Sequence, residues 1–415
     1  MLGKSIIRVM KSPMERFNDT GEDVEIWWDS SPLVFDSWKW KRIMAKPTVE
    51  ERDAEYELLS RYYNTSDPMG QLFHGVTTNP PLSGAVIKDD PGFWREMSIE
   101  KKRQNPDAST HEIWWMVYKE VVKRGAEKYL HVFRASNYKY GYISGQVDPR
   151  DYQNEEAMKQ QALELASLAS NVMVKIPGTE QGVRVIKFLT SKGIPTNCTL
   201  AYVLPQFAAV AQAVKEGLEE AKKNGVDLTF WRSVITSMTG RYEALGNFQK
   251  ESEELGIELT EADIRWSSIA IFKKAINYME ENGYPSKMLI CSMRSGPVVD
   301  GKTRLWHFEK LAGAPAVFTC PPKYIDQVDE FGIDIEFDSD GWKEPVPEEV
   351  LEKLNKFQYF REAYDPKGLE PPQFNTHPAT IATAQQFSKA TDEMENFVAE
   401  SINNADIKKR LQITI

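Results

Sequence analysis

A lysine ends one of the most apolar short runs in the chain, Val172-Met-Val-Lys175. If this run is a buried strand, the ammonium group at its end is partly desolvated, which lowers its pKa and favours the neutral amine. A neutral buried amine can attack a carbonyl carbon and form a Schiff base. The competing interpretation is a structural ion pair between Lys175 and a carboxylate such as Asp29.

Other polar side chains also stand where short apolar runs end. Asp29 could transfer a proton as a general acid or base, or it could only neutralise Lys175. Asn79, Asn197 and Thr199 could form hydrogen bonds with substrate hydroxyls. For each of these three residues the alternative is the capping of a loop or turn.

Two arginines and a serine could bind an anion. Arg241 follows one apolar run, and Ser292 and Arg294 follow the next one along the chain. Guanidinium groups present planar arrays of donors that match phosphate oxygens, so this set predicts an oxyanion clamp. The alternative is that both arginines are ordinary surface residues.

The pattern of apolar runs predicts the elements that position these residues. Eight short β-rich runs alternate with helical patterns, which indicates parallel βαβ units. Eight such units close a (βα)8 TIM barrel, an α/β fold whose active sites lie at the carboxyl ends of the strands. The competing fold is a doubly wound open sheet, which is disfavoured because no GxGxxG segment follows the first strand. The expected strands are Val24–Trp28, Leu72–Val76, Tyr129–Phe133, Val172–Lys175, Pro195–Thr199, Leu228–Ile235, Met288–Cys291 and Ala316–Thr319.

Two connections between the expected strands are too long for a bare barrel. They run over residues 30–71 and 80–128, and each contains a charged helical pattern. We therefore expect residues 1–331 to form one barrel with these two insertions, and residues 332–415 to form a helical C-terminal extension packed on it. Amphipathic patterns predict helices over residues 48–63, 180–191 (with Thr179 as the N-cap), 201–224, 241–256, 261–282, 347–363 and 379–401.

The composition excludes several other classes of protein. The 415 residues carry 51 Lys and Arg against 61 Asp and Glu, and the net charge of −10 argues against a nucleic-acid-binding protein. No apolar run approaches the ~18 residues of a transmembrane helix, and the first residues lack a signal-peptide core, so we expect a cytoplasmic protein with no membrane partner. The cysteines are too few and scattered for a disulfide framework, and the histidines lack zinc-binding spacing, so we expect no metal. These residues are Cys198, Cys291 and Cys320, and His74, His111, His131, His307 and His377.

Taken in order, the segments around these polar residues resemble the transaldolase family. The similarity extends over roughly Val24 to Gly332. A single Thr-Thr-Asn-Pro segment would be weak evidence, but an ordered set at the ends of several strands is specific. The matching segments are Gly75-Val-Thr-Thr-Asn79-Pro, Val147-Asp-Pro-Arg150, Val172-Met-Val-Lys-Ile-Pro-Gly-Thr179, Gly193-Ile-Pro-Thr-Asn-Cys-Thr-Leu200, Gly240-Arg241 and Cys291-Ser-Met-Arg294.

The resemblance implies a class I aldol mechanism on a (βα)8 barrel, with no metal and no cofactor. Lys175 matches the Schiff-base lysine, and Asp29 matches the carboxylate that moves the proton of the C4 hydroxyl. Thr199 matches the threonine that positions the catalytic water. The residues that match substrate-binding positions are Asn79 and Asn197 for the dihydroxyacetone unit, and Arg241, Ser292 and Arg294 for the phosphate.

Three positions depart from the family pattern. Gln146 stands where transaldolases have a glutamate that exchanges protons through a water, and glutamine cannot do this at neutral pH. The fructose-6-phosphate aldolase subgroup, which releases free dihydroxyacetone, is similar in carrying glutamine here. Met238 matches neither the phenylalanine of transaldolases nor the tyrosine of those aldolases. Thr236 replaces a serine and keeps the hydroxyl.

We therefore expect a transaldolase of carbohydrate metabolism, in the pentose phosphate pathway, that transfers dihydroxyacetone from a phosphorylated ketose to an aldehyde acceptor. The first alternative is an aldolase that releases free dihydroxyacetone, and the second is a non-catalytic sugar-phosphate-binding barrel. The expected partners are small-molecule sugar phosphates, with no nucleic acid and no membrane. The sequence leaves open whether the chain forms a homo-oligomer.

Overall fold

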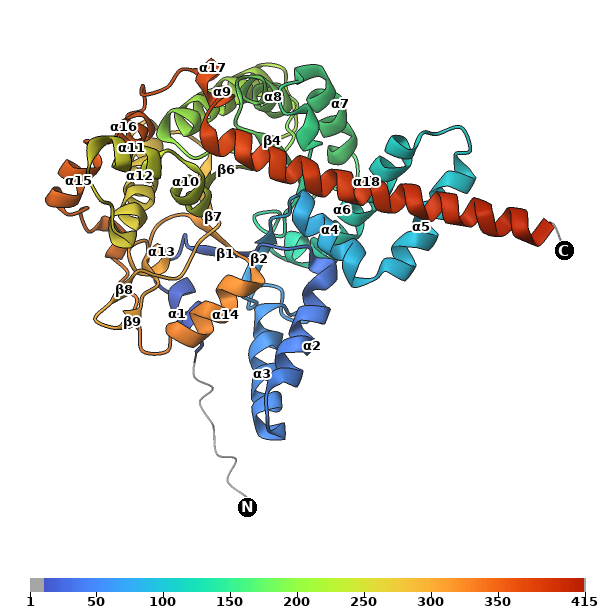
Figure 1. The fold of residues 1–415 in the computed structure, drawn as a ribbon, viewed down its shortest axis with the longest axis horizontal. Helices are drawn as coiled ribbons and strands as arrows, with labels where there is room; N and C mark the ends of the chain where they lie inside the picture. The colour runs from blue at the N-terminus through green and yellow to red at the C-terminus, as the bar shows by residue number, and fades with distance from the viewer. Residues whose placement is uncertain (1–10, 414–415) are drawn as a thin grey trace.

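The chain forms a closed barrel of eight parallel strands (Figure 1). The computed structural model describes residues 11–413, and side chains as far as residue 403. Around the barrel the strands follow the order β1-β10-β7-β6-β5-β4-β3-β2, which confirms the expected (βα)8 fold. A short antiparallel pair, β8 and β9, lies in the loop after β7. The strands are β1 (Glu25–Trp28), β2 (Phe73–Val76), β3 (Ile143–Gln146), β4 (Val172–Pro177), β5 (Thr196–Thr199), β6 (Ser233–Met238), β7 (Lys287–Cys291), β8 (Val298–Val299), β9 (Lys302–Thr303) and β10 (Val317–Cys320).

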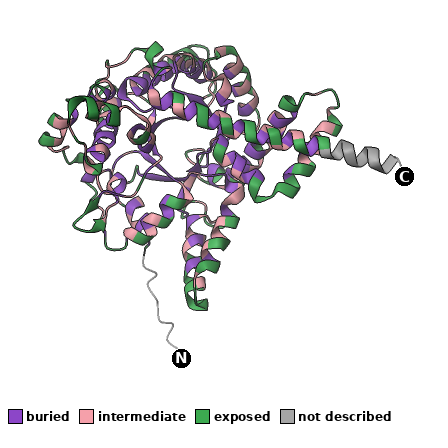
Figure 2. Cartoon of the chain, viewed as in Figure 1, coloured by how far each residue is buried: buried purple, intermediate pink, exposed green. Residues whose placement is uncertain are grey.

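Helices surround the barrel and fill its long connections. Thr179 caps α8 by accepting a hydrogen bond from the backbone N–H of Gly182 at 3.1 Å, as expected from the sequence. Figure 2 shows buried residues concentrated in the barrel wall and in the helix faces turned toward it. The α-helices are α1 (Pro13–Asn18), α2 (Phe35–Ala45), α3 (Val49–Tyr62), α4 (Pro80–Asp89), α5 (Pro91–Gln104), α6 (Thr110–Ala135), α7 (Glu155–Ala166), α8 (Glu180–Ser191), α9 (Leu204–Lys223), α10 (Thr239–Leu245), α11 (Phe248–Leu255), α12 (Glu261–Glu281), α13 (Trp306–Glu309), α14 (Pro322–Phe331), α15 (Glu348–Leu354), α16 (Gln358–Tyr364), α17 (Pro371–Phe374) and α18 (Pro378–Ile413). The 3-10 helices are η1 (Pro32–Val34), η2 (Pro149–Asp151) and η3 (Gly341–Lys343).

The expected third strand, Tyr129–Phe133, is wrong, because these residues form the end of helix α6. A capping box between Ser109 and Glu112 starts this helix, and buried side chains then recur at helical spacing over its whole length. The local β-rich composition is therefore overridden by a long amphipathic pattern. The third strand is β3, and Gln146 is its last residue.

Other expected elements differ at their boundaries. Strand β6 begins at Ser233 and not at Leu228. The helix expected over residues 241–256 is divided into α10 and α11, which are separated at Gly246. A Cβ at Gly246 would lie 2.1 Å from the phenol oxygen of Tyr359, so the chain opens here to admit a side chain from the C-terminal extension. The helix expected over 347–363 is likewise divided into α15 and α16.

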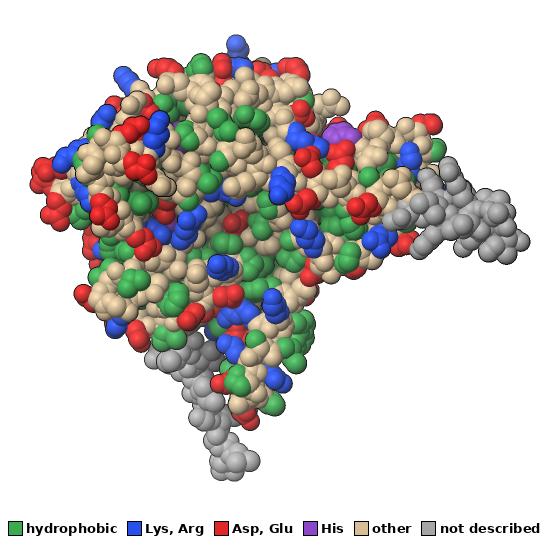
Figure 3. All heavy atoms as spheres, in the orientation of Figure 1, with side chains coloured by type: hydrophobic (Ala, Val, Ile, Leu, Met, Phe, Trp, Pro, Cys, Tyr) green, Lys and Arg blue, Asp and Glu red, His purple; other side chains and the backbone are tan. Residues whose placement is uncertain are grey.

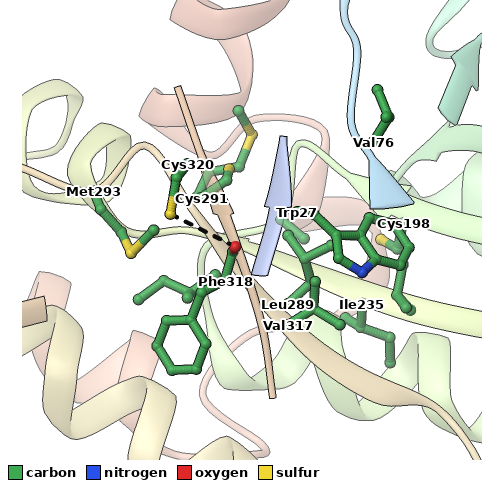
Figure 4. Close-up of a cluster of buried hydrophobic side chains, with 14 of the residues drawn as sticks. Trp27, Val76, Cys198, Ile235, Leu289, Cys291, Met293, Val317, Phe318 and Cys320 are labelled. Carbon is green, nitrogen blue, oxygen red and sulfur yellow. Dashed lines mark hydrogen bonds between the residues drawn. The ribbon is translucent and has the colours of Figure 1, made fainter. Parts of the chain in front are cut away.

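Strand β1 lines the barrel interior with alternate residues. In a strand, residues two apart point to the same face, so Glu25, Trp27 and Asp29 form one inward row. Trp27 packs in the apolar middle layer with side chains of the other strands (Figure 4). A Cβ at Gly75 on β2 would lie 2.5 Å from the indole ring of Trp27, so only glycine leaves room for this side chain.

Glu25 is held by two cations at the amino end of the barrel. Its carboxylate accepts hydrogen bonds from Arg232 Nη2 at 2.6 Å and from Lys287 Nζ at 2.8 Å, and also from the indole N–H of Trp27 at 3.1 Å. Burial alone would raise the pKa of Glu25, but these positive charges lower it to about 2. The charged carboxylate therefore stabilises the folded barrel.

Replacing Glu25 with glutamine is expected to lower the free energy of unfolding at pH 7. A pKa lowered from 4.5 to about 2 corresponds to roughly 3 kcal/mol of stability. Because the pKa is lower in the folded state, this contribution is complete above pH 4.5 and is lost as the pH falls toward 2. Urea unfolding across this range should show the difference between the native protein and Glu25→Gln shrinking at low pH. The exposed Asp107→Asn serves as the control, and a difference that stays constant with pH would contradict the assignment.

The last helix crosses the barrel at the carboxyl ends of its strands. Helix α18 packs against α4, α5, α6, η2 and α10. Since α4, η2 and α10 directly follow β2, β3 and β6, this face is the one at which the strands end. Figure 1 shows α18 passing over one edge of the barrel near β4 and extending outward past α4 and α5, while α2 and α3 project from the barrel in another direction.

Candidate active site

Lys175 lies on β4 at the centre of a row of polar residues. The strand register places Gln146 of β3 directly beside Lys175, and Asn197 of β5 on its other side. All three side chains therefore point to the same face, the interior of the barrel. The side chain of Lys175 is almost fully buried, and its Nζ donates a hydrogen bond to the backbone carbonyl of Thr78 at 2.9 Å.

Asp29 follows β1 at the same end of the barrel. Its Oδ1 accepts a hydrogen bond from the hydroxyl of Thr77 at 2.7 Å, and that hydroxyl also contacts the hydroxyl of Thr319. No direct salt bridge joins Asp29 to Lys175 in the described residues. The adjacent residues Thr77 and Thr78 hold the two groups instead.

Burial shifts both titratable groups toward their neutral forms. Desolvation raises the pKa of Asp29 above 3.8, although the positive charges of Lys175 and Arg241 oppose the shift. Desolvation also lowers the pKa of Lys175 below 10.5, with Arg241 adding to the effect and Asp29 opposing it. Both shifts are in the direction that favours proton exchange near neutral pH.

A hydrogen-bonded chain of small polar side chains lies across β4. Asn197 Nδ2 donates to the hydroxyl of Ser144 at 2.9 Å, and the hydroxyl of Thr236 donates to Asn197 Oδ1 at 2.7 Å. These residues come from β3, β5 and β6, and all of them are buried. The carboxamide of Asn197 is therefore fixed in one orientation beside Lys175.

Thr199 and Met238 lie at the ends of β5 and β6. The hydroxyl of Thr199 contacts the sulfur of Met238 at 3.8 Å, and both side chains are buried. Asn79 is placed differently, since its side chain caps α4 by accepting a hydrogen bond from Leu82 N–H at 3.0 Å. For Asn79 the structure shows the capping contact that was the alternative to substrate binding.

Gln146 is fixed through its backbone by a residue of α6. Tyr118 Oη donates to the carbonyl of Gln146 at 2.8 Å and accepts from its N–H at 2.9 Å. Strands β2 and β3 are paired only at Val76 and Ile143. Beyond that pair, the phenol of Tyr118 supplies hydrogen bonds to the backbone of β3 in place of a neighbouring strand. Within the described residues, the side-chain oxygen Oε1 of Gln146 is buried without a hydrogen-bond partner.

The residues expected to bind an anion come from adjacent segments. A Cβ at Gly240 would lie 2.1 Å from the carbonyl oxygen of Ser292 and 2.9 Å from Nε of Arg294. Glycine therefore allows the start of α10, and with it Arg241, to lie directly against the segment after β7. Arg241 is partly buried, and Arg294 is exposed.

Two buried side chains, His307 and Arg265, form hydrogen bonds with the backbone of Arg294. His307 Nδ1 accepts the N–H of Arg294 at 3.1 Å, and Arg265 Nη1 donates to the Arg294 carbonyl at 2.6 Å. On its other side, His307 Nε2 lies 3.0 Å from the carboxylate of Glu243 on α10. Burial and the charge of Arg265 lower the pKa of His307, so the imidazole acts as a neutral link between the segments that carry Arg241 and Arg294.

Sequence reasoning missed four residues that organise this site. Thr77, Thr78 and Thr319 lie at the ends of strands that the sequence predicted, and Ser144 lies in β3, which it did not predict; no role followed from their residue types. For Thr77, Thr78 and Ser144 the available signal was their position within two residues of Asn79 or Gln146. Hydroxyl residues are so common in turns that the signal is weak without the register of the barrel.

The cysteines do not form a nucleophilic or metal site. Cys198, Cys291 and Cys320 are buried in the apolar cluster of Figure 4. Burial raises the pKa of each thiol, to about 11 for Cys291, so thiolate chemistry is disfavoured. Among the residues that the structure describes, no group of His, Cys, Asp and Glu has the arrangement of a metal site. None of the helices in the described part of the chain combines the length and apolarity needed to cross a membrane.

Comparison with known families shows which family the chain resembles. Residues 65–367 match the model of the Transaldolase/Fructose-6-phosphate aldolase family, which is well over half of the chain. The chain belongs to this family. Within the Transaldolase/Fructose-6-phosphate aldolase family, the matched segment contains β2 to β10 but not β1 with Asp29 or helix α18.

Relatives in the family are proteins named transaldolase. The chain is similar to a transaldolase of Kocuria rhizophila, with 30% identity over 211 residues that cover 48% of this chain and 56% of the relative. It is also similar to transaldolase 2 of Streptomyces avermitilis, with 31% identity over 205 residues (48% and 54%). A transaldolase of Campylobacter jejuni is 28% identical over 207 residues (47% and 60%). The chain thus spans little more than half the length of the curated relatives it matches.

Proposed function

We propose that this protein is a transaldolase that forms a Schiff base between Lys175 and a phosphorylated ketose. It would cleave the C3–C4 bond and transfer the dihydroxyacetone unit to an aldehyde acceptor. The observation that carries this proposal is the buried amine of Lys175, whose pKa is lowered, at the end of the barrel where Asp29 also lies. Family membership supports the same chemistry.

Each step of the reaction uses a group that the site holds in position. The neutral amine of Lys175 attacks the ketose carbonyl, and loss of water leaves an iminium. Asp29 takes the proton of the C4 hydroxyl, the C3–C4 electron pair moves to the iminium, and the shortened aldehyde leaves. The resulting enamine then attacks the carbonyl carbon of the acceptor while Asp29 returns the proton. Hydrolysis of the new Schiff base restores the free amine.

The remaining polar residues would orient the substrate. Asn197 and Thr236 lie beside Lys175 in one hydrogen-bonded chain, so they are placed to hold the hydroxyls of the dihydroxyacetone unit. Thr199 would position the catalytic water. Asn79 would bind the dihydroxyacetone unit only through side-chain atoms that its capping hydrogen bond with Leu82 leaves available. Arg241, Ser292 and Arg294 would bind the phosphate, and that remote binding energy would align the reacting carbons.

Borohydride trapping tests the proposal directly. Incubation of the protein with fructose 6-phosphate and sodium borohydride should add the mass of a reduced dihydroxyacetone unit. Peptide mapping should place this adduct on Lys175. Failure to form an adduct with any ketose phosphate would favour a non-catalytic sugar-phosphate-binding barrel.

Gln146 supports a second candidate, an aldolase that releases free dihydroxyacetone. Its unpartnered Oε1 can accept a hydrogen bond from a water or a substrate hydroxyl, but an amide cannot exchange a proton at neutral pH. To separate the two reactions, fructose 6-phosphate is supplied with and without erythrose 4-phosphate as acceptor. Rapid release of dihydroxyacetone without acceptor assigns the aldolase, whereas strict dependence on acceptor assigns the transaldolase.

Replacing Gln146 with glutamate is expected to speed adduct formation by roughly tenfold, less than the ~10²- to 10⁴-fold that a native general acid–base group usually contributes. A carboxylate at this position can pass protons to and from the water that leaves during Schiff-base formation. The rate of borohydride trapping measures the effect. Gln160→Glu, which adds the same charge at an exposed position on α7, is the matched control. An unchanged or slower rate of trapping in Gln146→Glu would contradict this role.

A further inference from the structure

The guanidinium of Arg241 is held by the C-terminal helix. Its Nη1 donates hydrogen bonds to Gln386 Oε1 at 2.6 Å and to the hydroxyl of Thr383 at 3.4 Å. The ring of Phe387 lies beneath it, 5.1 Å from the guanidinium carbon. All three partners come from consecutive turns of α18, which lies outside the segment that matches the family model.

Helix α18 is anchored firmly enough to act as a fixed support. Arg150 of η2 pairs with Asp392 at 3.0 Å and with Glu395 at 2.7 Å, both on this helix. Thr383 and Phe387 are fully buried against the barrel. The space-filling view shows basic and acidic side chains interspersed along α18 and around a hollow at the centre of the barrel (Figure 3).

The chemistry of the Gln386 contact leaves Arg241 available to an anion. A carboxylate partner would neutralise the guanidinium, whereas a carboxamide fixes its orientation and leaves its positive charge in place. One terminal nitrogen is used by α18, and a guanidinium has further N–H donors to offer. The positive charge of Arg241 also acts to lower the pKa values of Asp29 and Lys175.

We propose that Thr383 and Gln386 of α18 are positioning residues that orient Arg241 toward the terminal phosphate of the substrate and so set the preference for phosphorylated ketoses. This inference rests on the proposed function, because it assigns the phosphate of that reaction to Arg241. It adds that the anion site is completed by a helix that the family model does not include. The carboxamide of Gln386 is uncharged, so the positive charge of Arg241 remains available to attract the phosphate dianion of the substrate.

The test compares two adjacent glutamines on α18. Gln386→Glu places a carboxylate against Arg241, and Gln385→Glu adds the same charge at the neighbouring exposed position, whose side chain forms no hydrogen bond with Arg241 in the described residues. We expect Gln386→Glu to raise KM for fructose 6-phosphate by about tenfold or more, since a charged hydrogen bond to the ligand is lost. The effect on kcat should be smaller, and Gln385→Glu should behave as the native protein. Thr383→Val, which keeps the shape of the side chain, should raise KM in the same direction by less.

Two readouts separate this inference from the proposed function. Dihydroxyacetone carries no phosphate, so its borohydride trapping should change much less in Gln386→Glu than KM for fructose 6-phosphate does. Titration calorimetry with inorganic phosphate measures the anion site without any reaction, and Gln386→Glu should weaken that binding by about tenfold. Equal effects in Gln386→Glu and Gln385→Glu, or unchanged KM and phosphate binding in Gln386→Glu, would overturn the role of α18. If no substrate forms an adduct but phosphate binding still depends on Gln386, only the Schiff-base proposal fails.

Discussion

Lys175→Met is expected to reduce kcat with fructose 6-phosphate by about 10⁴-fold or more, because the covalent route through a Schiff base is lost. Methionine keeps a long unbranched side chain in the buried position on β4, so the barrel should remain folded. Borohydride should then add no dihydroxyacetone unit to the variant. The measurements are steady-state rates and intact mass after trapping, with thermal unfolding to verify the fold.

Lys273 provides a matched control for this result. It is also buried, and desolvation lowers the pKa of its amine to about 8. Its Nζ donates to the backbone carbonyls of Gly341 at 3.0 Å and Glu344 at 2.7 Å, so it supports the extension and not the barrel interior. Peptide mapping should therefore find the adduct on Lys175 and none on Lys273. Labelling of both lysines, or trapping that persists in Lys175→Met, would show that reactivity follows the lowered pKa alone and that Lys175 is not the specific nucleophile.

Asp29→Asn should lower kcat by about 10²- to 10⁴-fold, the usual contribution of general acid–base catalysis, while adduct formation continues. The asparagine cannot take the proton of the C4 hydroxyl. Removing the negative charge also removes a group that raises the pKa of Lys175, so more of the amine is neutral near pH 7. The expected signature is a low turnover rate together with undiminished trapping of the unphosphorylated dihydroxyacetone.

The pH dependence gives a second measure of the same pair. The carboxylate form of Asp29 is needed, and burial raises its pKa, so activity should begin to fall with decreasing pH at values above 3.8. The neutral amine of Lys175 is needed as well, and its lowered pKa makes that form available below 10.5. The acidic limb of the kcat profile should disappear in Asp29→Asn. Asp326→Asn removes another carboxyl group whose pKa is raised by burial, on α14, and should keep the native profile.

The parts of the fold that the sequence predicted are those with strong local patterns. The run that ends at Lys175 is apolar and bounded on both sides, so its strand was placed nearly correctly. The run Tyr129–Phe133 is equally β-rich, but it continues a helix whose periodicity extends over 26 residues. Choosing between these outcomes required the whole of α6 and not only the local composition.

The candidate site was predictable in its residue types but not in its contacts. Strand ends placed Lys175, Asp29 and Asn197 at one end of the barrel, and the strand register shows that Lys175 and Asn197 are direct neighbours. The contact between Arg241 and Gln386 joins residues 145 positions apart, and no pattern within either segment signals it. Such contacts depend on the path of the C-terminal extension across the barrel.

The two hydrogen bonds between Tyr118 and the backbone of Gln146 give the long connection between β2 and β3 a structural role in the barrel. One phenol supplies both a donor and an acceptor to the backbone of β3, at a level where β2 no longer pairs with it. Helix α6 therefore acts there as a substitute for a neighbouring strand. The inserted segment is therefore part of the barrel wall. A shortened chain without it would lose the hydrogen bonds that hold the end of β3, and with them the support for Gln146 beside Lys175.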